Sequence, residues 1–267
     1  MISYREIEAE NMEGRVSPQA IEKDYHLDWY LAALWSLDLF PRFSFYGGTA
    51  IKKLYIPNHR FSEDIDLISG DRLSPELMGE ALDQAHRSLE KEANLFYSFR
   101  PEEIQTVGTR ARFLIHYRGF SELGGIKRFL IDFALGIEGL PSPVSKKLQT
   151  RYTDLKDKKI KIQALPLEFI CAEKLALMVD RRRKEPRDLY DLWSVLAQVK
   201  AFNSRAFWTR YEESLSYKTD FLVIQSSLRD FDFKNAWEIR LKHQVPSLPP
   251  FDEAVSEVIA KLKAQNF

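Results

Sequence analysis

The sequence predicts an α+β protein: a domain built on a mixed β-sheet, followed by an all-helical domain. Short apolar runs bounded by glycine and proline, which are typical of strands, are concentrated in the first 164 residues. From residue 166 onward, apolar residues recur at three- and four-residue steps, which is typical of amphipathic helices. We therefore expect a sheet domain over 1–164 and a helical domain over 165–267, a division that a chain of 267 residues readily allows.

Helices and strands alternate through the first domain. Ser17-Pro18 is a typical helix start, because serine caps free N–H groups and proline fits the first helical position, and this helix is expected to run through Trp35. A strand over 43–46 ends at Gly47-Gly48 and is followed by a short helix over 49–55. The other elements expected in this domain are a strand at 64–68, a helix at 75–92, and strands at 96–99, 111–117 and 129–133.

Prolines mark the approach to the second domain. Pro141-Ser142-Pro143 interrupts the strand pattern, and the basic stretch after it is expected to form a loop or an edge strand. The helices expected in the second domain cover 167–183, 186–199, 206–215 and 227–241, followed by a terminal helix that ends at Lys263.

Charge is balanced overall but uneven along the chain. With 39 basic and 39 acidic residues, the net charge argues neither for nor against nucleic-acid binding. Residues 1–40 carry three basic and eight acidic side chains, whereas residues 146–187 carry thirteen basic and six acidic ones. The basic residues gather at 156–161 and at 181–187, where two interpretations stay open: a surface that attracts phosphate, or a solvated face.

The sequence shows no feature typical of a secreted or membrane protein. Cys171 is the only cysteine, so no internal disulfide can form, which suits a reducing compartment. The longest charge-free runs, such as 29–37, are far shorter than the roughly 18 apolar residues that a membrane helix needs. The five histidines are scattered without metal-ligand spacing. We expect a cytoplasmic protein with no membrane association.

Asp64 and Asp66 are the first candidates for chemistry. Side chains alternate between the faces of a strand, so both carboxylates point to one face while Ile65 and Leu67 point to the other. Two adjacent carboxylates repel each other unless a cation lies between them, and oxygen ligands suit Mg²⁺. Taken alone, however, an Asp-x-Asp pattern is more often a solvated strand face.

The residues around this pair favour a nucleotide site. Gly47-Gly48 permits close backbone approach, and Thr49 opens a helix whose N–H groups can bind an anion. A phosphate cradle beside a metal pair is what nucleoside triphosphate binding requires. Asp132 lies in a strand that is otherwise apolar, where an unpaired charge is costly, so it is the natural third carboxylate. Three carboxylates can hold two divalent ions about 4 Å apart.

Four motifs in this order resemble those of a known family: Phe45–Ile51, Arg60–Leu67, Lys174–Arg181 and Arg187–Leu192. A strand, Gly-Gly, a short helix and Asp-x-Asp, followed by a later single carboxylate, are similar to the DNA polymerase β-like nucleotidyltransferase superfamily. Over residues 15–195 the four motifs together resemble the AbiEii/AbiGii toxin nucleotidyltransferases. The departures are small, with Gly48 where some members have Ser and Ser62 where others have Thr.

This resemblance implies an enzyme that uses Mg²⁺ or Mn²⁺ to move a nucleotide from an NTP to a hydroxyl, either at the 3′ end of a tRNA or other RNA or on a protein. It also implies a toxin of a toxin–antitoxin or abortive-infection system, opposed by a separately encoded antitoxin. The expected metal ligands are Asp64, Asp66 and Asp132. The expected nucleotide-binding residues are Gly47, Gly48, Thr49, Arg60, Ser62, Lys174 and Arg181.

Several of these residues leave alternatives open. Ser62 is expected to contact the triphosphate or a metal-bound water, and Arg60 to contact phosphate or to hold its loop. Lys174 lies on an apolar helix stripe, so either its stem covers the core while its head reaches water or, as the resemblance favours, its ammonium reaches the triphosphate. Asp188 and Asp191 share a helix face, and the resemblance implies that at least one is catalytic and orients Lys174 or the acceptor, with Asp188 preferred.

Two other functions stay open. A metal-dependent nuclease is suggested by Asp132 together with Asp157-Lys158-Lys159, although that stretch is so rich in lysine that chance explains it. The other is a non-enzymatic nucleotide- or RNA-binding module on a transferase scaffold, and the intact carboxylates argue against it.

Overall fold

The computed structural model describes residues 2–10, 16–120, 123–180, 185–215 and 217–265 of the chain. The described residues form two compact units, one made of residues 1–57 and 61–165 and the other of residues 58–60 and 166–267. The short segment Asn58–Arg60, which the sequence division at residue 164 assigned to the sheet domain, belongs to the helical unit. Each unit is described separately below.

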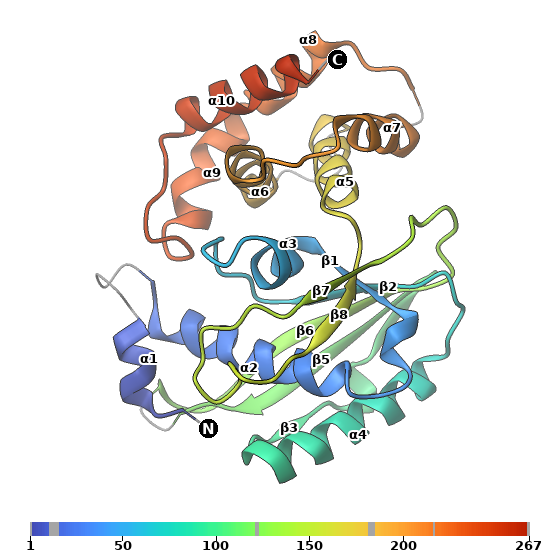
Figure 1. The fold of residues 1–267 in the computed structure, drawn as a ribbon, viewed down its shortest axis with the longest axis vertical. Helices are drawn as coiled ribbons and strands as arrows, with labels where there is room; N and C mark the ends of the chain where they lie inside the picture. The colour runs from blue at the N-terminus through green and yellow to red at the C-terminus, as the bar shows by residue number, and fades with distance from the viewer. Residues whose placement is uncertain (1, 11–15, 121–122, 181–184, 216, 266–267) are drawn as a thin grey trace. The chain divides into compact units, whose positions relative to one another are not determined.

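The first unit is centred on a mixed sheet (Figure 1), which has eight strands among the described residues. The strand order is β3-β5-β6-β2-β1-β8-β7, and β4 pairs with β5. Two pairs, β2 with β6 and β1 with β8, are parallel, and the other pairs are antiparallel. The predicted mixed sheet is therefore confirmed. The strands are β1 Ser44–Tyr46, β2 Ile65–Ile68, β3 Tyr97–Ser98, β4 Gln105–Val107, β5 Arg110–Arg118, β6 Ile126–Ala134, β7 Val144–Lys147 and β8 Lys161–Ala164.

The two faces of this sheet differ in character. Phe45, Leu67 and Phe133 are buried on one face, where Trp35, directly after helix α2 (Pro18–Leu34), packs against the Phe45 ring. Helix α4 (Pro75–Ala93) covers the same face, since Gly79 lies close to the ring of Phe113. The opposite face carries polar residues of β2, β5 and β6. Burial on one side and polar residues on the other leave the second face available for chemistry.

Local sequence signals predicted most helix starts correctly. The Ser17 hydroxyl accepts a hydrogen bond from Ala20 N at 3.1 Å, and Pro18 is the first residue of α2, as expected. The short helix after Gly48 is different from the prediction, because α3 (Gly47–Ala50) passes into a π-helical turn over Ile51–Tyr55. The basic stretch after Pro143 forms the edge strand β7, one of its two expected forms. Helix α1 (Tyr4–Glu10) and strand β4 were not predicted.

The second unit is helical throughout its described regular structure, which confirms the expected helical C-terminal region. One expectation is wrong: a single helix over 227–241 is replaced by α8 (Phe221–Leu228) and α9 (Phe231–Leu241). The Asp230 carboxylate accepts a hydrogen bond from Asp232 N at 2.8 Å, and this cap starts a new helix. No helix in the described part of the chain is long and apolar enough to cross a membrane. The helices are α5 Leu167–Val179, α6 Pro186–Gln198, α7 Ser204–Ser214, α8 Phe221–Leu228, α9 Phe231–Leu241 and α10 Phe251–Ala264.

Candidate active site

The sheet of the first unit places Asp66 and Asp132 side by side. These residues are direct partners in the parallel β2–β6 pairing, and Tyr46 is the partner of Asp66 on β1. Neighbouring strands lie about 4.8 Å apart, so both carboxylates leave the same face at adjacent positions. Ile65 and Leu67 are buried on the other face, as the alternation predicted. Residues far apart in the sequence therefore meet beside the glycine turn.

Asp64 lies immediately before β2 and is half-buried. The backbone N–H of Leu130 on β6 donates a hydrogen bond to its carboxylate, so the side chain is held against the strand that carries Asp132. Burial, and then the negative charge of Glu63, raise the pKa of Asp64, and Asp132 acts in the same direction. An anion whose charge is disfavoured in this way gains more than usual from a nearby cation.

Gly47 is required at the turn for two separate reasons. Its φ is +81°, a conformation that residues with a side chain rarely adopt. A Cβ at this position would also collide with the Asp66 carboxylate oxygen Oδ2. The Thr49 hydroxyl donates a hydrogen bond to the backbone carbonyl of Asp64 at 2.5 Å, which ties the turn to the aspartate segment. Thr49 thus has a structural contact here, and its nucleotide contact stays a prediction.

Asp132 is paired with an arginine that the sequence analysis missed. Arg112, its direct partner on β5, donates from Nε to Oδ1 at 2.6 Å and from its terminal nitrogen to Oδ2 at 3.0 Å. Hydrogen bonding to Asp132, together with the charges of Asp132, Asp64 and Asp66, raises the pKa of Arg112. One guanidinium therefore contacts Asp132 and is also influenced by the charges of Asp64 and Asp66. Alternation on β5 could have placed Arg112 on this face, but not opposite Asp132.

The residues present suit a divalent ion in part. Mg²⁺ typically takes one or two carboxylate ligands and completes its shell with water and substrate phosphates. Asp64 and Asp66 can supply the two carboxylates. Within the described ranges, no three acidic, histidine or cysteine side chains are already gathered to hold a metal. Asp132 would have to exchange Arg112 for the ion, so the metal site with three carboxylates stays a prediction.

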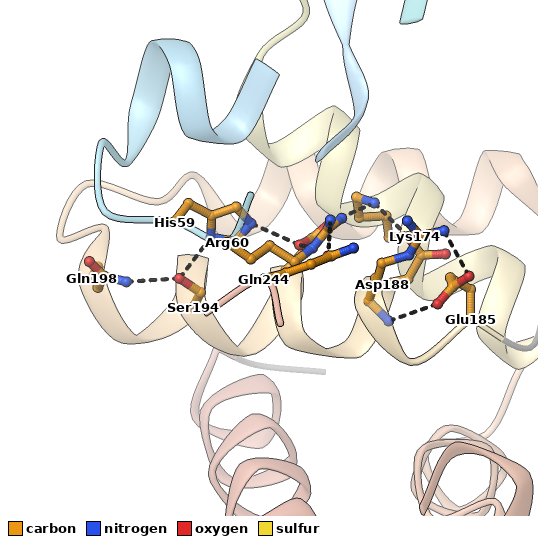
Figure 2. Close-up of polar contacts among 10 residues, drawn as sticks. His59, Arg60, Lys174, Glu185, Asp188, Ser194, Gln198 and Gln244 are labelled. Atoms are coloured by element: carbon orange, nitrogen blue, oxygen red, sulfur yellow. Dashed lines mark hydrogen bonds and ion pairs between the residues drawn. The ribbon is translucent and has the colours of Figure 1, made fainter. Parts of the chain in front are cut away.

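The motif residues of the second unit form a buried cluster around Asp191, which we call the Asp191 cluster; Figure 2 shows its polar contacts. Arg60 binds the Asp191 carboxylate with two nitrogens, at 2.6 Å and 2.8 Å. His59 Nε2 lies 2.8 Å from the same carboxylate, and the Lys174 ammonium lies 2.9 Å from it. The members of the cluster are His59, Arg60, Lys174, Asp188, Asp191, Ser194 and Gln244.

Opposite charges dominate the electrostatics of this cluster. Burial alone would raise the pKa of Asp191, but Arg60, Lys174 and His59 hold it well below its ordinary value. Burial would likewise lower the pKa of Lys174, but Asp188 and Asp191 outweigh this and raise it. The ammonium donates to Asp188 Oδ1 at 2.5 Å. Because both aspartates contact Lys174, they share a helix face, as their spacing predicted.

The cluster favours one of the two alternatives left open for Arg60 and contains residues that the sequence did not indicate. Arg60 is buried and also donates to the Gln244 side chain at 3.3 Å, which favours the role of holding its loop over contacting phosphate. His59 also lies 3.1 Å from the Ser194 hydroxyl. No spacing rule links a histidine in a loop to a serine 135 positions later.

The remaining predicted residues are placed as follows. Ser62 is half-buried and Gly48 is buried in the first unit. Arg181, predicted to bind nucleotide, lies outside the described residues, as does most of the basic stretch that follows it. The roles assigned to these residues stay predictions.

Comparison with known proteins identifies the family. The nucleotidyl transferase AbiEii toxin family, of type IV toxin–antitoxin systems, matches residues 29–261. The chain belongs to this family. It is therefore a nucleotidyltransferase, and the family resemblance of its four motifs is confirmed. No curated protein matches the chain.

Two solved structures are similar to this chain to different degrees. MenT4, a nucleotidyltransferase toxin from Mycobacterium tuberculosis, is similar with a TM-score of 0.67 and 19% identity, over 99% of this chain and 90% of that one. A nucleotidyltransferase-like protein from Paracoccidioides brasiliensis matches with a TM-score of 0.40 and 16% identity, over 72% of this chain and 86% of the other. The likeness to MenT4 supports the predicted fold class, a nucleotidyltransferase sheet domain followed by a helical region.

Proposed function

We propose that this AbiEii-family enzyme transfers a nucleoside monophosphate from an NTP to the 3′ hydroxyl of an RNA, most simply a tRNA, with Mg²⁺ or Mn²⁺. The observation that carries the proposal is the pairing of Asp66 with Asp132 beside Gly47, in a chain that matches a nucleotidyltransferase family. As the toxin of a type IV system, it would be opposed by a separately encoded antitoxin in the cytoplasm.

The three aspartates and the glycine turn of the first unit have separate roles in this proposal. Asp64 and Asp66 would hold the divalent ion, with Asp132 as a third ligand once Arg112 has moved away. The ion, when bound, supplies positive charge to the triphosphate and favours deprotonation of the attacking hydroxyl. The glycine turn and Ser62 would bind the triphosphate, and Gly47, which has no side chain, leaves the backbone there close to Asp66. Asp132 accepts or orients the proton of the acceptor hydroxyl.

Two residues of the second unit, Lys174 and Asp188, are also assigned roles in this proposal. On the family resemblance we assign Lys174 to neutralising phosphate charge; Asp188 and Asp191 contact its buried ammonium and keep it protonated. Asp191 holds Arg60 and His59 as well, whereas Asp188 has the shorter contact with Lys174. We therefore assign Asp188 to orienting the lysine during catalysis and Asp191 mainly to holding the cluster.

The nuclease alternative gains no support from the structure. Lys158 of the candidate Asp157-Lys158-Lys159 element is ion-paired with Glu92 at 2.9 Å and lies over the Trp29 ring. Asp157 is exposed in the turn before β8, whereas Asp132 is paired with Arg112 on β6. An assay of RNA cleavage separates the two functions.

The test uses the purified chain with each of the four α-³²P-labelled NTPs, in Mg²⁺ or Mn²⁺, with total tRNA or with total protein as the acceptor. We expect a labelled RNA of increased length with at least one NTP. Asp66→Asn should abolish the label, and Asp157→Ala, an exposed carboxylate as matched control, should not. Absence of labelled RNA with every NTP and both ions would contradict the proposal, and labelled protein alone would move the acceptor from RNA to protein.

A further inference from the structure

Two lysines stand on the same sheet face as the catalytic carboxylates. Phe45 and Ala164 are partners in the β1–β8 pairing, so the residues of β8 that alternate with Ala164 share the face of Tyr46 and Asp66. Lys161 is one of them, three residues before Ala164. Lys147 is its direct partner on β7. Asp66, Lys161 and Lys147 therefore leave one face, on strands β2, β8 and β7.

This pair of lysines is electrostatically unfavourable by itself. Like charges directly opposite each other on neighbouring strands destabilise a sheet. Both side chains are exposed, and among the described residues neither has an ion pair or another electrostatic partner. Lysine on an edge strand can prevent pairing with other chains, which would explain Lys147 on β7. Lys161 is not at the free edge formed by β7, because β8 is paired with β7 along its length and with β1 at Ala164.

The surroundings of the pair are basic and polar. Residues 144–164 carry seven basic and two acidic side chains. On the shared face Ser145 and Gln163 are the neighbouring partners, and both can bind an anion. One of the two acidic residues, Asp154, is engaged by the Tyr25 hydroxyl at 2.8 Å. The local field therefore favours a negatively charged partner.

We propose that the β7–β8 edge of this face, centred on Lys147 and Lys161, binds backbone phosphates of the RNA acceptor. β8 is two strands from β2, and Lys161 lies several residues along the strand from the level of Asp66, which corresponds to roughly 15 Å. A few nucleotides span this distance. An RNA whose 3′ end reaches the carboxylates would pass the lysine pair on the same face. This inference rests on the proposed RNA acceptor.

The test compares two double variants of the full chain. Lys147→Gln with Lys161→Gln removes two charges from the proposed surface, and Arg87→Gln with Lys91→Gln removes two charges from exposed positions of α4. Binding of fluorescein-labelled tRNA, without NTP, is measured by anisotropy at several salt concentrations. The lysine variant should bind about 10-fold more weakly. Its affinity should also fall less steeply with salt, with a slope of log K against log salt that corresponds to about two fewer phosphate contacts. The α4 variant should bind like the wild type.

Further measurements separate this surface from a structural role. The lysine variant should raise the KM for RNA while leaving kcat and the KM for NTP unchanged. Its melting temperature should stay the same or rise, because like-charge repulsion is removed. Equal weakening by both double variants, or unchanged tRNA binding by the lysine variant, would overturn the proposal. Poly-L-glutamate that competes as well as RNA of equal charge would overturn the assignment to RNA.

The outcomes also distinguish this inference from the proposed function. If the wild type transfers nucleotides to RNA but the lysine variant binds and reacts like the wild type, the surface is wrong and the function stands. If the lysine variant binds tRNA more weakly but no transfer to RNA occurs, the surface is supported and the proposed reaction is wrong.

Discussion

The first unit holds Asp66 and Asp132 at a half-exposed sheet face, whereas the second unit holds Asp191 fully buried among Arg60, Lys174 and His59. At the sheet face Asp132 is paired with Arg112, and the charges of Asp64 and Asp66 act on the same guanidinium. In the Asp191 cluster, oppositely charged side chains compensate the buried carboxylate in place. The contrast teaches that exposure matters: a half-exposed pair such as Asp132–Arg112 can exchange its cation, whereas the buried charges around Asp191 suit holding structure.

The same contrast extends to buried lysines. Two carboxylates raise the pKa of Lys174 against the effect of burial. Lys52 lies in the π-helical turn that follows α3. Its burial outweighs the opposing charge of Asp24 and lowers its pKa to about 8. Burial alone therefore does not decide whether a lysine keeps its charge; the number and distance of its carboxylate neighbours do.

The largest expected effect is on activity at the sheet face. Asp66→Asn should reduce nucleotide transfer on the order of 10³-fold or more, because several kcal/mol of charge stabilisation in the transition state are lost. Its free energy of unfolding should fall less than that of Asp191→Asn, because Asp66 is half-buried and Asp191 is fully buried. Single-turnover transfer rates and urea unfolding measure the two quantities. A large loss of stability would show that Asp66 belongs with the structural aspartates.

The next effect is on stability in the Asp191 cluster. Asp191→Asn should lower the free energy of unfolding by about 3–5 kcal/mol, because it leaves buried cationic groups without their carboxylate. Asp188→Asn should cost less, since Lys174 keeps Asp191 as a partner. Urea unfolding of both variants tests this. Equal stability losses would contradict the separate roles given to the two aspartates.

Lys52 should make the free energy of unfolding depend on pH, by about 3 kcal/mol in total. Its pKa of about 8 in the folded chain lies below the ordinary 10.5, so between these values the unfolded chain binds a proton that the folded chain does not. The contribution of Lys52 to the free energy of unfolding therefore rises with pH across this window. Lys52→Met should remove that rise. Unfolding of both proteins at several pH values gives the difference, and a constant difference would contradict the lowered pKa.

A matched pair of glycines tests the turn. Gly47→Ala and Gly108→Ala both place a side chain at positive φ, but only the first meets another residue, the Asp66 carboxylate. Gly47→Ala should therefore cost about 1–2 kcal/mol more stability, from overpacking, and should also reduce nucleotide transfer. Gly108→Ala should leave transfer unchanged. Equal effects of the two substitutions on both measurements would show that the contact with Asp66 is unimportant.

The smallest effect is expected for Arg112→Gln. The ion pair with Asp132 is partly exposed, with 45% and 18% of the two side chains accessible, so its loss should cost less than about 1 kcal/mol of stability. Binding of Mn²⁺ without NTP, followed by calorimetry, should become tighter by about 5-fold, because a competing cation is removed and RT ln 5 is about 1 kcal/mol. Weaker Mn²⁺ binding would instead show that Arg112 supports the metal site.

The sequence by itself determined the features that depend on neighbouring residues. The serine–proline start of α2, the burial of Ile65 and Leu67 beside half-buried aspartates, and the shared helix face of Asp188 and Asp191 all follow from local periodicity and capping. The four motifs were also sufficient to indicate the family, since a motif needs only residue types in order.

Only the tertiary structure decided which distant residues meet. Strand order and register place Arg112 opposite Asp132 and put Lys147 and Lys161 on the face of Asp66, and no local signal specifies either. The assignment of Asn58–Arg60 to the helical unit, where His59 and Arg60 bind Asp191, is equally non-local. The physical reason is that strand pairing and buried ion pairs depend on the packing of the whole chain, whereas capping and alternation depend on a few consecutive residues.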